Sequence, residues 1–221
     1  MHAIIRKTLC SQLIFLALLF LPIVSAKAGT LALSYEDQTL ILDGERRTIR
    51  VPKGYQLELL NRLDAPRMLT FAENGDLFIG SKSGKIYRML PPYTKAEVLV
   101  EMGDYPHSIA FRQGEILIAQ RSGVYRAPYQ PGQSVISPDS LVLLAALPGG
   151  AGHSSRTIAV GPDGRIYASL GIQSNCSDQF VGMSYPFEDR RGGVMVLNES
   201  AGKASWEPFA SGLRNPVGFD W

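Results

Sequence analysis

The sequence has few residues of the kinds that cross-link a small protein or hold a metal in it. It contains two cysteines and three histidines in 221 residues. Cys10 lies in an N-terminal apolar run, so Cys176 is the one thiol of the remaining chain and no internal disulfide framework is available. A free thiol and a bond to another chain both stay open for Cys176. His2, His107 and His153 are too few for a zinc cage built on histidine.

The signatures of several common enzyme classes are also absent. There is no Gly-x-Ser-x-Gly elbow, no phosphate-binding loop and no His-Glu-x-x-His motif. No stretch keeps an apolar period of 3.6 residues, so long amphipathic helices are not expected. Basic runs and stripes of aromatic and basic residues are missing as well, which argues against a nucleic-acid partner. These absences leave an all-β protein with a small-molecule site as the class to test.

The first 28 residues have the pattern of a secretory signal peptide. Arg6 and Lys7 precede an apolar run from Leu9 to Leu21, and small residues follow up to Ala28. The run is short for a helix that spans a bilayer, although an uncleaved anchor is the alternative. Cleavage after Ala26 or Ala28 predicts a periplasmic or secreted protein without stable membrane insertion.

Removal of residues 1–28 also changes the charge. The full chain has 22 basic and 20 acidic side chains, for a formal charge of +2. Arg6, Lys7 and Lys27 would leave with the signal, so the mature chain would carry one net negative charge. The formal charge of +2 of the full sequence therefore gives no support to nucleic-acid binding.

What the sequence does contain is a repeat. Segments that begin at Ala65 and Tyr105 align with each other, and a third copy, GGAGHSSRTIAVGPDGRIYASLG, begins at Gly149. A fourth copy starts at Arg214 with RNPVGFDW and ends after eight residues, at Trp221. Each complete copy has an apolar strand, a tight turn with glycine, a second strand, another turn and a third strand. A four-stranded antiparallel unit that recurs every ~40 to 50 residues is typical of β-propeller blades.

The predicted fold class is therefore all-β, a β-propeller of about three blades plus the first strand of a fourth, within residues 29–221. An ordinary β-sandwich with similarly spaced turns is the alternative. Residues Tyr55–Leu63 are predicted to form a lone strand before the first blade, and Val217–Trp221 to begin the fourth. Ser174–Gly193 is predicted to be a long insert in the third copy. A propeller closes with at least four blades, so the chain is expected to be part of a larger ring.

The repeat also predicts where polar residues meet. The first strand of each blade lines the central channel, so residues that lead into these strands gather at one mouth. The residues concerned are Arg67, His107, His153, Arg156, Arg214 and Asn215. Several guanidinium groups at one mouth favour a small anionic ligand. His153 on its glycine-rich loop has the chemistry of a general base, and a structural histidine is the alternative.

Two motifs resemble a known family. GHSSRTIAVGPDGRIYASLGIQ, from Gly152 to Gln173, and FASGLRNPVGFDW, from Phe209 to Trp221, resemble the pyrroloquinoline quinone (PQQ)-dependent glucose/sorbosone dehydrogenases, which are exported six-bladed propellers. The resemblance extends over Tyr55–Trp221. It implies an oxidoreductase that oxidises an aldose or a sorbosone-like sugar at the anomeric carbon, with PQQ as hydride acceptor and an external electron acceptor.

The resemblance also implies roles for single residues. His153 would be the catalytic base that takes the proton of the anomeric hydroxyl, and Arg214 would lie against the quinone oxygens. Asn215, Gln173 and Arg156 would contact the cofactor or the sugar beside it; three arginines at the mouth suit a cofactor with three carboxylates. Calcium is implied as a second cofactor, with its ligands in a second half of the ring that this chain lacks.

Departures from the family pattern leave other functions open. Glucose-type members have an acidic residue directly before the histidine, where this chain has Gly152, as in the sorbosone branch. With half of the ring absent, the chain alone is expected to be inactive. A non-catalytic propeller that binds a ligand or protein at the channel mouth is the main alternative. A calcium-dependent lactonase is less favoured, because the predicted mouth has no carboxylate.

Overall fold

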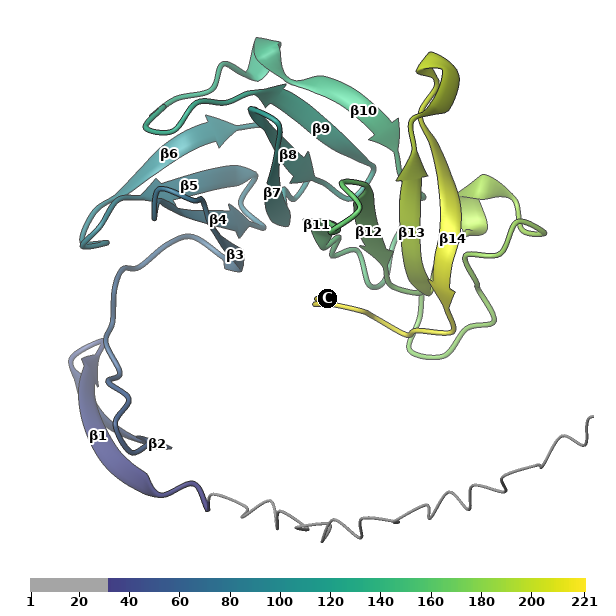
Figure 1. Cartoon of the computed structure of the whole chain (residues 1–221). Helices are drawn as coiled ribbons and strands as arrows, with labels where there is room; N and C mark the ends of the chain where they lie inside the picture. Colours follow the sequence, from purple (N-terminus) through teal and green to yellow (C-terminus); the bar gives the residue numbers. More distant parts are fainter. Residues whose placement is uncertain (1–31) are drawn as a thin grey trace, which may run out of the picture. The chain divides into compact units, whose positions relative to one another are not determined.

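A computed structural model describes residues 32–221 of the chain (Figure 1). The predicted signal peptide, residues 1–28, lies outside the described residues. Within residues 32–221, no helix has the length and apolar character needed to cross a bilayer. The chain divides into two compact units, the first ending at Glu58 and the second running from Leu59 to Trp221.

The described part of the first unit is a β-hairpin. Its strands are β1 (Tyr35–Leu42) and β2 (Glu45–Pro52), which pair antiparallel. Asp43 and Gly44 make the two-residue turn, with φ of 54° and 80°. Two successive positive φ angles are the geometry of a hairpin turn that suits Asp-Gly. The sequence therefore carried a strong local signal for this hairpin, which the repeat comparison did not use.

The lone strand predicted over Tyr55–Leu63 is not formed, and these residues have no regular secondary structure. The Gln38 side chain takes over part of the hydrogen bonding that a strand ladder would supply. Its Nε2 donates to Tyr55 O at 2.6 Å, and its Oε1 accepts from Leu57 N at 2.8 Å. An apolar pattern alone does not make a strand where the backbone finds partners of another kind.

The second unit consists of three four-stranded antiparallel sheets, each built from consecutive strands. The first sheet contains β3 (Pro66–Phe71), β4 (Leu77–Ser81), β5 (Lys85–Met89) and β6 (Ala96–Glu101). The second contains β7 (Ser108–Arg112), β8 (Glu115–Ala119), β9 (Gly123–Pro128) and β10 (Val142–Ala146). The third contains β11 (Ile158–Val160), β12 (Ile166–Leu170), β13 (Gly193–Asn198) and β14 (Ser205–Ser211).

The all-β class is confirmed, and each sheet corresponds to one complete copy of the repeat. The first strands of the three sheets are neighbours, because β7 contacts both β3 and β11 (Figure 1). The predicted turns at residues 73–76, 112–115 and 161–164 join the first strand of each sheet to its second. Residues that precede β3, β7 and β11 are therefore placed at one end of this group of strands.

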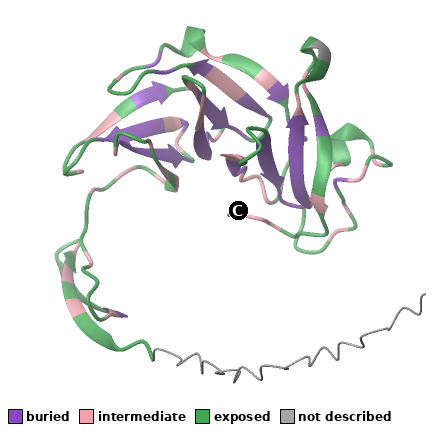
Figure 2. Cartoon of the chain, in the orientation of Figure 1, coloured by how far each residue is buried: buried purple, intermediate pink, exposed green. Residues whose placement is uncertain are grey.

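The core lies between the sheets, and β8 shows how the sequence builds it. Ile116 and Ile118 belong to the cluster between the first and second sheets, whereas Leu117 and Ala119 belong to the cluster between the second and third. All four side chains are fully buried (Figure 2). A strand covered on both faces has apolar residues at successive positions, which explains the run ILIA. Each buried aliphatic side chain of this kind contributes about 1.5–3 kcal/mol.

The strand predicted at Val217–Trp221 is not formed either. No described strand pairs with this segment, and it lies instead against the third sheet. Thr157 Oγ1 donates to Val217 O, and the ring of Trp221 packs edge-on against Tyr167 with 5.1 Å between centroids. Side-chain contacts thus hold the segment where a strand ladder is missing. The predicted insert is present: β12 ends at Leu170 and β13 begins at Gly193, with one 3₁₀ turn over Phe187–Asp189 between them.

Candidate functional site

His153 lies on the loop between β10 and β11, and both its backbone and its ring are bonded to one carbonyl. Its backbone N donates to Ile172 O at 3.1 Å, and its Nδ1 lies 2.9 Å from the same oxygen. A carbonyl oxygen can only accept, so this contact assigns the ring proton to Nδ1. With the ring proton on Nδ1, the lone pair is on Nε2. The bond to Ile172 O thus sets the orientation of this half-buried ring.

Two glycines allow this close packing. A Cβ at Gly152 would lie 1.7 Å from Gln173 O, and a Cβ at Gly171 would lie 2.4 Å from the Cβ of His153. Gly152 also has a φ of +82°, which side chains rarely adopt. No acidic residue can therefore stand before His153 in this conformation. The carbonyl of Ile172 takes the orienting role that a carboxylate would have.

Gly152→Ala is expected to destabilise the His153 loop more than its backbone angle alone would require. The positive φ costs about 1–2 kcal/mol for alanine, and the overlap with Gln173 O adds a further 1–3 kcal/mol, roughly. Gly164→Ala is the matched control, because Gly164 has a φ of +75° and nothing within 4 Å of its Cβ position. Denaturant unfolding gives the unfolding free energy of both variants. Equal losses of stability in the two would contradict the close approach of Gly152 to Gln173 O.

The backbone strip from Gly171 to Gln173 brings the predicted residues together. On one side Ile172 O holds His153, and on the other Ile172 N donates to Arg214 O at 2.8 Å. Ser155 Oγ donates to Asn215 Oδ1 at 3.3 Å. His153 and Asn215 are thus separated only by the space beside Gly171, whose Cβ would lie 2.6 Å from Asn215 Oδ1.

Arg214 and Gln173 lie at the edges of this strip with polar groups free. The exposed Arg214 guanidinium donates from Nε to Asn175 O at 3.0 Å and from Nη2 to Asn175 Oδ1. Its Nη1 makes no hydrogen bond among the described residues. Arg214 lines a cavity of about 200 Å³, and the exposed Gln173 lines another of about 300 Å³. Both cavities are bordered by the insert.

Arg156 and His107 lie inside the protein, which differs from the open mouth that the repeat predicts. Arg156 is 0% exposed, and its guanidinium donates to Pro148 O at 2.8 Å, Ser155 O at 3.0 Å and His153 O at 3.1 Å. Burial, together with the positive charge of Arg191, lowers the pKa of Arg156 to about 9, so it remains a cation at neutral pH. The reason for its inward direction is local: the loop before β11 has carbonyls without backbone partners.

His107 is buried in a similar way. Its Nδ1 lies 2.9 Å from Arg156 O, and burial lowers the pKa of the ring. Tyr105 stacks edge-on against His107 and accepts a hydrogen bond from Arg67 Nε at 3.1 Å. The exposed Arg67 is thus linked to the interior through Tyr105. Of the predicted cationic groups, only Arg67 and Arg214 present their guanidinium groups to solvent.

Arg191 is the residue that the sequence comparison missed. It is 1% exposed, and its guanidinium donates to five carbonyls around His153. The acceptors are Gly171 O at 2.7 Å, Ala151 O at 2.8 Å, His153 O at 3.0 Å, Gly149 O at 3.2 Å and Ile172 O at 3.4 Å. Burial lowers the pKa of Arg191. The only signal in the sequence is an Arg-Arg-Gly-Gly stretch at the end of the insert, with no counterpart in the other copies.

The His153 loop is therefore fixed from within by two guanidinium groups that contact carbonyls and no carboxylate. Arg156 and Arg191 both donate to His153 O. Charge-assisted hydrogen bonds of this kind are stronger than neutral ones, and arginine supplies them in a rigid fork. The arrangement holds the His153 loop in place and gives the region a positive charge. Within residues 32–221, no cluster of three or more His, Cys, Asp or Glu could bind a metal, and Cys176 is free and exposed.

Comparison of the sequence with protein-family models and with curated proteins finds no match. Solved structures, by contrast, share the fold. The calcium structure of a family AA12 carbohydrate-active enzyme from Trichoderma reesei has a TM-score of 0.59 and 17% identity, over 82% of this chain and 44% of that one. The iodide structure of the AA12 family from the same organism gives 0.58 and 17%, over 77% and 42%.

A third structure is the holo form of the PQQ domain of pyranose dehydrogenase from Coprinopsis cinerea. Its TM-score is 0.51 at 14% identity, over 63% of this chain and 34% of that domain. The chain thus spans less than half the length of each of these structures. At such low identity the likeness concerns the fold alone. The three repeated antiparallel sheets of residues 66–211 therefore share the fold of part of these three structures.

Proposed function

We propose that this chain carries the proton-accepting part of an exported PQQ-dependent sugar oxidoreductase built on a β-propeller. The substrate would be an aldose or a sorbosone-like sugar, oxidised at the anomeric carbon. One observation carries the proposal: the bond from His153 Nδ1 to Ile172 O leaves Nε2 as an acceptor, on a loop that meets Asn215 and the Arg214 backbone at the Gly171–Gln173 strip. The adjacent first strands β3, β7 and β11 support the propeller, and residues 1–28 support export.

The residues around His153 suit PQQ in charge and in hydrogen bonding. The cofactor has three carboxylates and two quinone oxygens, which require cationic and amide donors. Arg214 offers a free Nη1, Gln173 offers a side-chain amide on the Gly171–Gln173 strip, and Asn215 offers another against Gly171. When bound, the quinone would accept the hydride. The described residues offer no calcium site, so calcium enters the proposal only as a component supplied from elsewhere.

His153 would take the proton of the anomeric hydroxyl at Nε2. The positive charge that then forms on the ring strengthens the bond from Nδ1–H to Ile172 O. Arg191 and Arg156 would act on this step by position, because they hold the backbone of the loop and do not reach the surface. Arg214 would stabilise negative charge on the acceptor. Electrons would leave to an external acceptor and the proton to solvent.

Dye-linked oxidation tests this proposal. The purified chain, and any longer reading frame that contains it, would be incubated with PQQ, calcium and a panel of aldoses that includes glucose. We expect sugar-dependent dye reduction that requires PQQ from a form with a complete ring, and none from this chain alone. Quinone binding without turnover of any aldose would favour the non-catalytic ligand-binding scaffold. Absence of both binding and turnover in the full reading frame would reject the quinoprotein function.

A further inference from the structure

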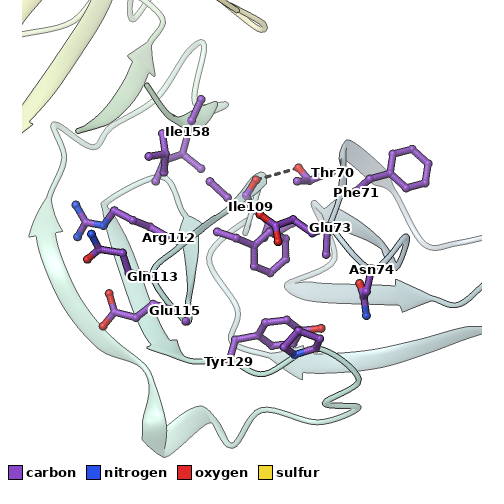
Figure 3. Close-up of a pocket in the computed structure, with 17 residues that line it drawn as sticks. Thr70, Phe71, Glu73, Asn74, Ile109, Arg112, Gln113, Glu115, Tyr129 and Ile158 are labelled. Carbon is purple, nitrogen blue, oxygen red and sulfur yellow. Dashed lines mark hydrogen bonds between the residues drawn. The ribbon is translucent and has the colours of Figure 1, made fainter. Parts of the chain in front are cut away.

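A third cavity, whose lining does not include His153, borders the turns that follow β3 and β7. Its volume is about 550 Å³, within the range of small-molecule sites. It is lined by the end of β3, by most of β7, by all of β11 and by those two turns (Figure 3). His153 and Arg156 precede β11, whereas the cavity includes Val160 at its end. The cavity and the His153 region are therefore separate sites.

The walls of this cavity are aromatic and aliphatic. Phe111 is fixed by ring contacts with Phe78 and Tyr129, whose centroids lie 5.0 Å and 5.3 Å away. Phe71 stands at the edge of the cavity with 62% of its surface exposed. In Figure 3, Tyr129 and Ile158 lie at two ends of the group, and the ring of Phe71 points away from it. That ring packs edge-on against Tyr93, with 5.9 Å between centroids. The flat apolar surface offered to a ligand is therefore that of Phe111 and Tyr129.

The polar groups at the rim fall into two sets. The first set has ion-pair partners. Arg112 Nη2 donates to Glu199 Oε1 at 3.0 Å, and Glu115 Oε1 lies 3.5 Å from Arg126 Nη1. Glu73 and Gln113, by contrast, make no side-chain hydrogen bond or ion pair among the described residues. Both are exposed and lie on the two turns that border the cavity (Figure 3).

The same two turns add further groups without partners. Asn74 Oδ1 accepts from Asp76 N at 3.2 Å, which leaves the amide N–H groups of Asn74 free. Gln113 has a φ of +50°, next to Gly114 at +79°. This turn position favours Asn, Asp or Gly, so glutamine is retained there at some backbone cost. The rim thus presents one carboxylate and two amides beside aromatic walls.

We propose that this cavity binds a short neutral saccharide, independently of any chemistry at His153. Carboxylate and amide groups can bond adjacent hydroxyls as acceptors and donors, and the C–H face of a sugar ring packs against aromatic side chains. The unpaired Glu73 disfavours an anion. A purely apolar ligand would bury the free amides without partners, which is costly. The inference concerns binding alone and goes beyond the proposed oxidoreductase function.

Titration calorimetry of the purified chain with maltose and with cellobiose, in the absence of PQQ, tests the proposal. We expect saturable binding of at least one of these disaccharides. Glu73→Gln and Gln113→Gly should each weaken it by about tenfold, the value of one hydrogen bond. Asn74→Ala, which removes the free amide N–H groups, should weaken it to a similar extent. Glu101→Gln, an exposed carboxylate away from the cavity, and His153→Asn should leave the affinity unchanged.

Three results would overturn the proposal. Neither disaccharide shows saturable binding, or binding survives all three cavity substitutions, or it is lost in His153→Asn and kept in Glu73→Gln. The last result would place the sugar at the His153 region. Glu73, Asn74 and Gln113 are exposed, so their substitution should leave the thermal unfolding temperature near that of the parent chain, and the unfolding curve of each variant verifies this. Failure of dye reduction with binding retained would reject the oxidoreductase alone.

Discussion

Replacement of His153 by asparagine is expected to lower the rate of PQQ-dependent sugar oxidation by ~10²–10⁴-fold, the contribution of a positioned general base. The amide N–H of asparagine can occupy the place of Nδ1–H and keep the bond to Ile172 O, which spans 2.9 Å in the parent chain. Nothing then replaces the lone pair of Nε2. Steady-state kinetics on the active full reading frame give the turnover rate, and fluorescence titration gives the PQQ affinity.

The design separates a base from a structural histidine. His153→Asn should retain PQQ affinity and the unfolding free energy while turnover falls. His153→Ala removes the bond to Ile172 O as well, so it should show the same loss of turnover with an additional loss of stability of about 1 kcal/mol. Turnover that survives in His153→Asn would reject the catalytic role. Equal losses of turnover and cofactor affinity would indicate that His153 serves the structure of the site.

Arg191→Gln is expected to destabilise the second unit by about 3 kcal/mol or more, equal to two charge-assisted hydrogen bonds. The guanidinium donates to five carbonyls, and a glutamine amide can reach only some of them. Carbonyls left buried without a donor carry a further penalty. Denaturant unfolding gives the loss. Arg191→Lys should cause an intermediate loss of stability, because lysine keeps the positive charge but lacks the planar guanidinium with its several N–H donors.

A second readout shows whether Arg191 positions His153. The chain has three histidines, so imidazole ¹⁵N spectra can resolve the His153 ring. The parent chain should show the Nδ1–H tautomer, and Arg191→Gln should shift the ring toward the Nε2–H tautomer as Ile172 O moves. Arg190→Gln is the matched control, because the Arg190 side chain bonds, among residues 32–221, only Met183 and Tyr185, both within the insert. An unchanged His153 tautomer in Arg191→Gln would contradict the positioning role.

Much of the fold could be predicted from the sequence because its signals are local. The three glycine turns at residues 73–76, 112–115 and 161–164 lie where the repeat places them, and each complete copy forms one four-stranded sheet. The two failed strand predictions, at 55–63 and 217–221, share a cause. A strand requires a neighbour with which to pair, and apolar alternation does not reveal whether that neighbour exists.

The candidate site was predictable only in part, for a related reason. The repeat and the family motif identified His153, Arg214 and Asn215, and the structure brings these residues to one strip of backbone. They also identified Arg156, whose guanidinium is buried against carbonyls. The direction of an arginine side chain depends on which carbonyls lack partners nearby, and this follows from the path of the chain.

The sequence by itself therefore determined the repeated all-β units, their turns and the segments that meet at the beginnings of β3, β7 and β11. The tertiary structure decided how His153 is oriented and held. The bond from His153 to Ile172 O and the five bonds of Arg191 join segments about 20 to 40 residues apart through backbone carbonyls. Every residue has a carbonyl, so no pattern of side chains marks the ones that will accept. Only folding brings those carbonyls to the imidazole and the guanidinium.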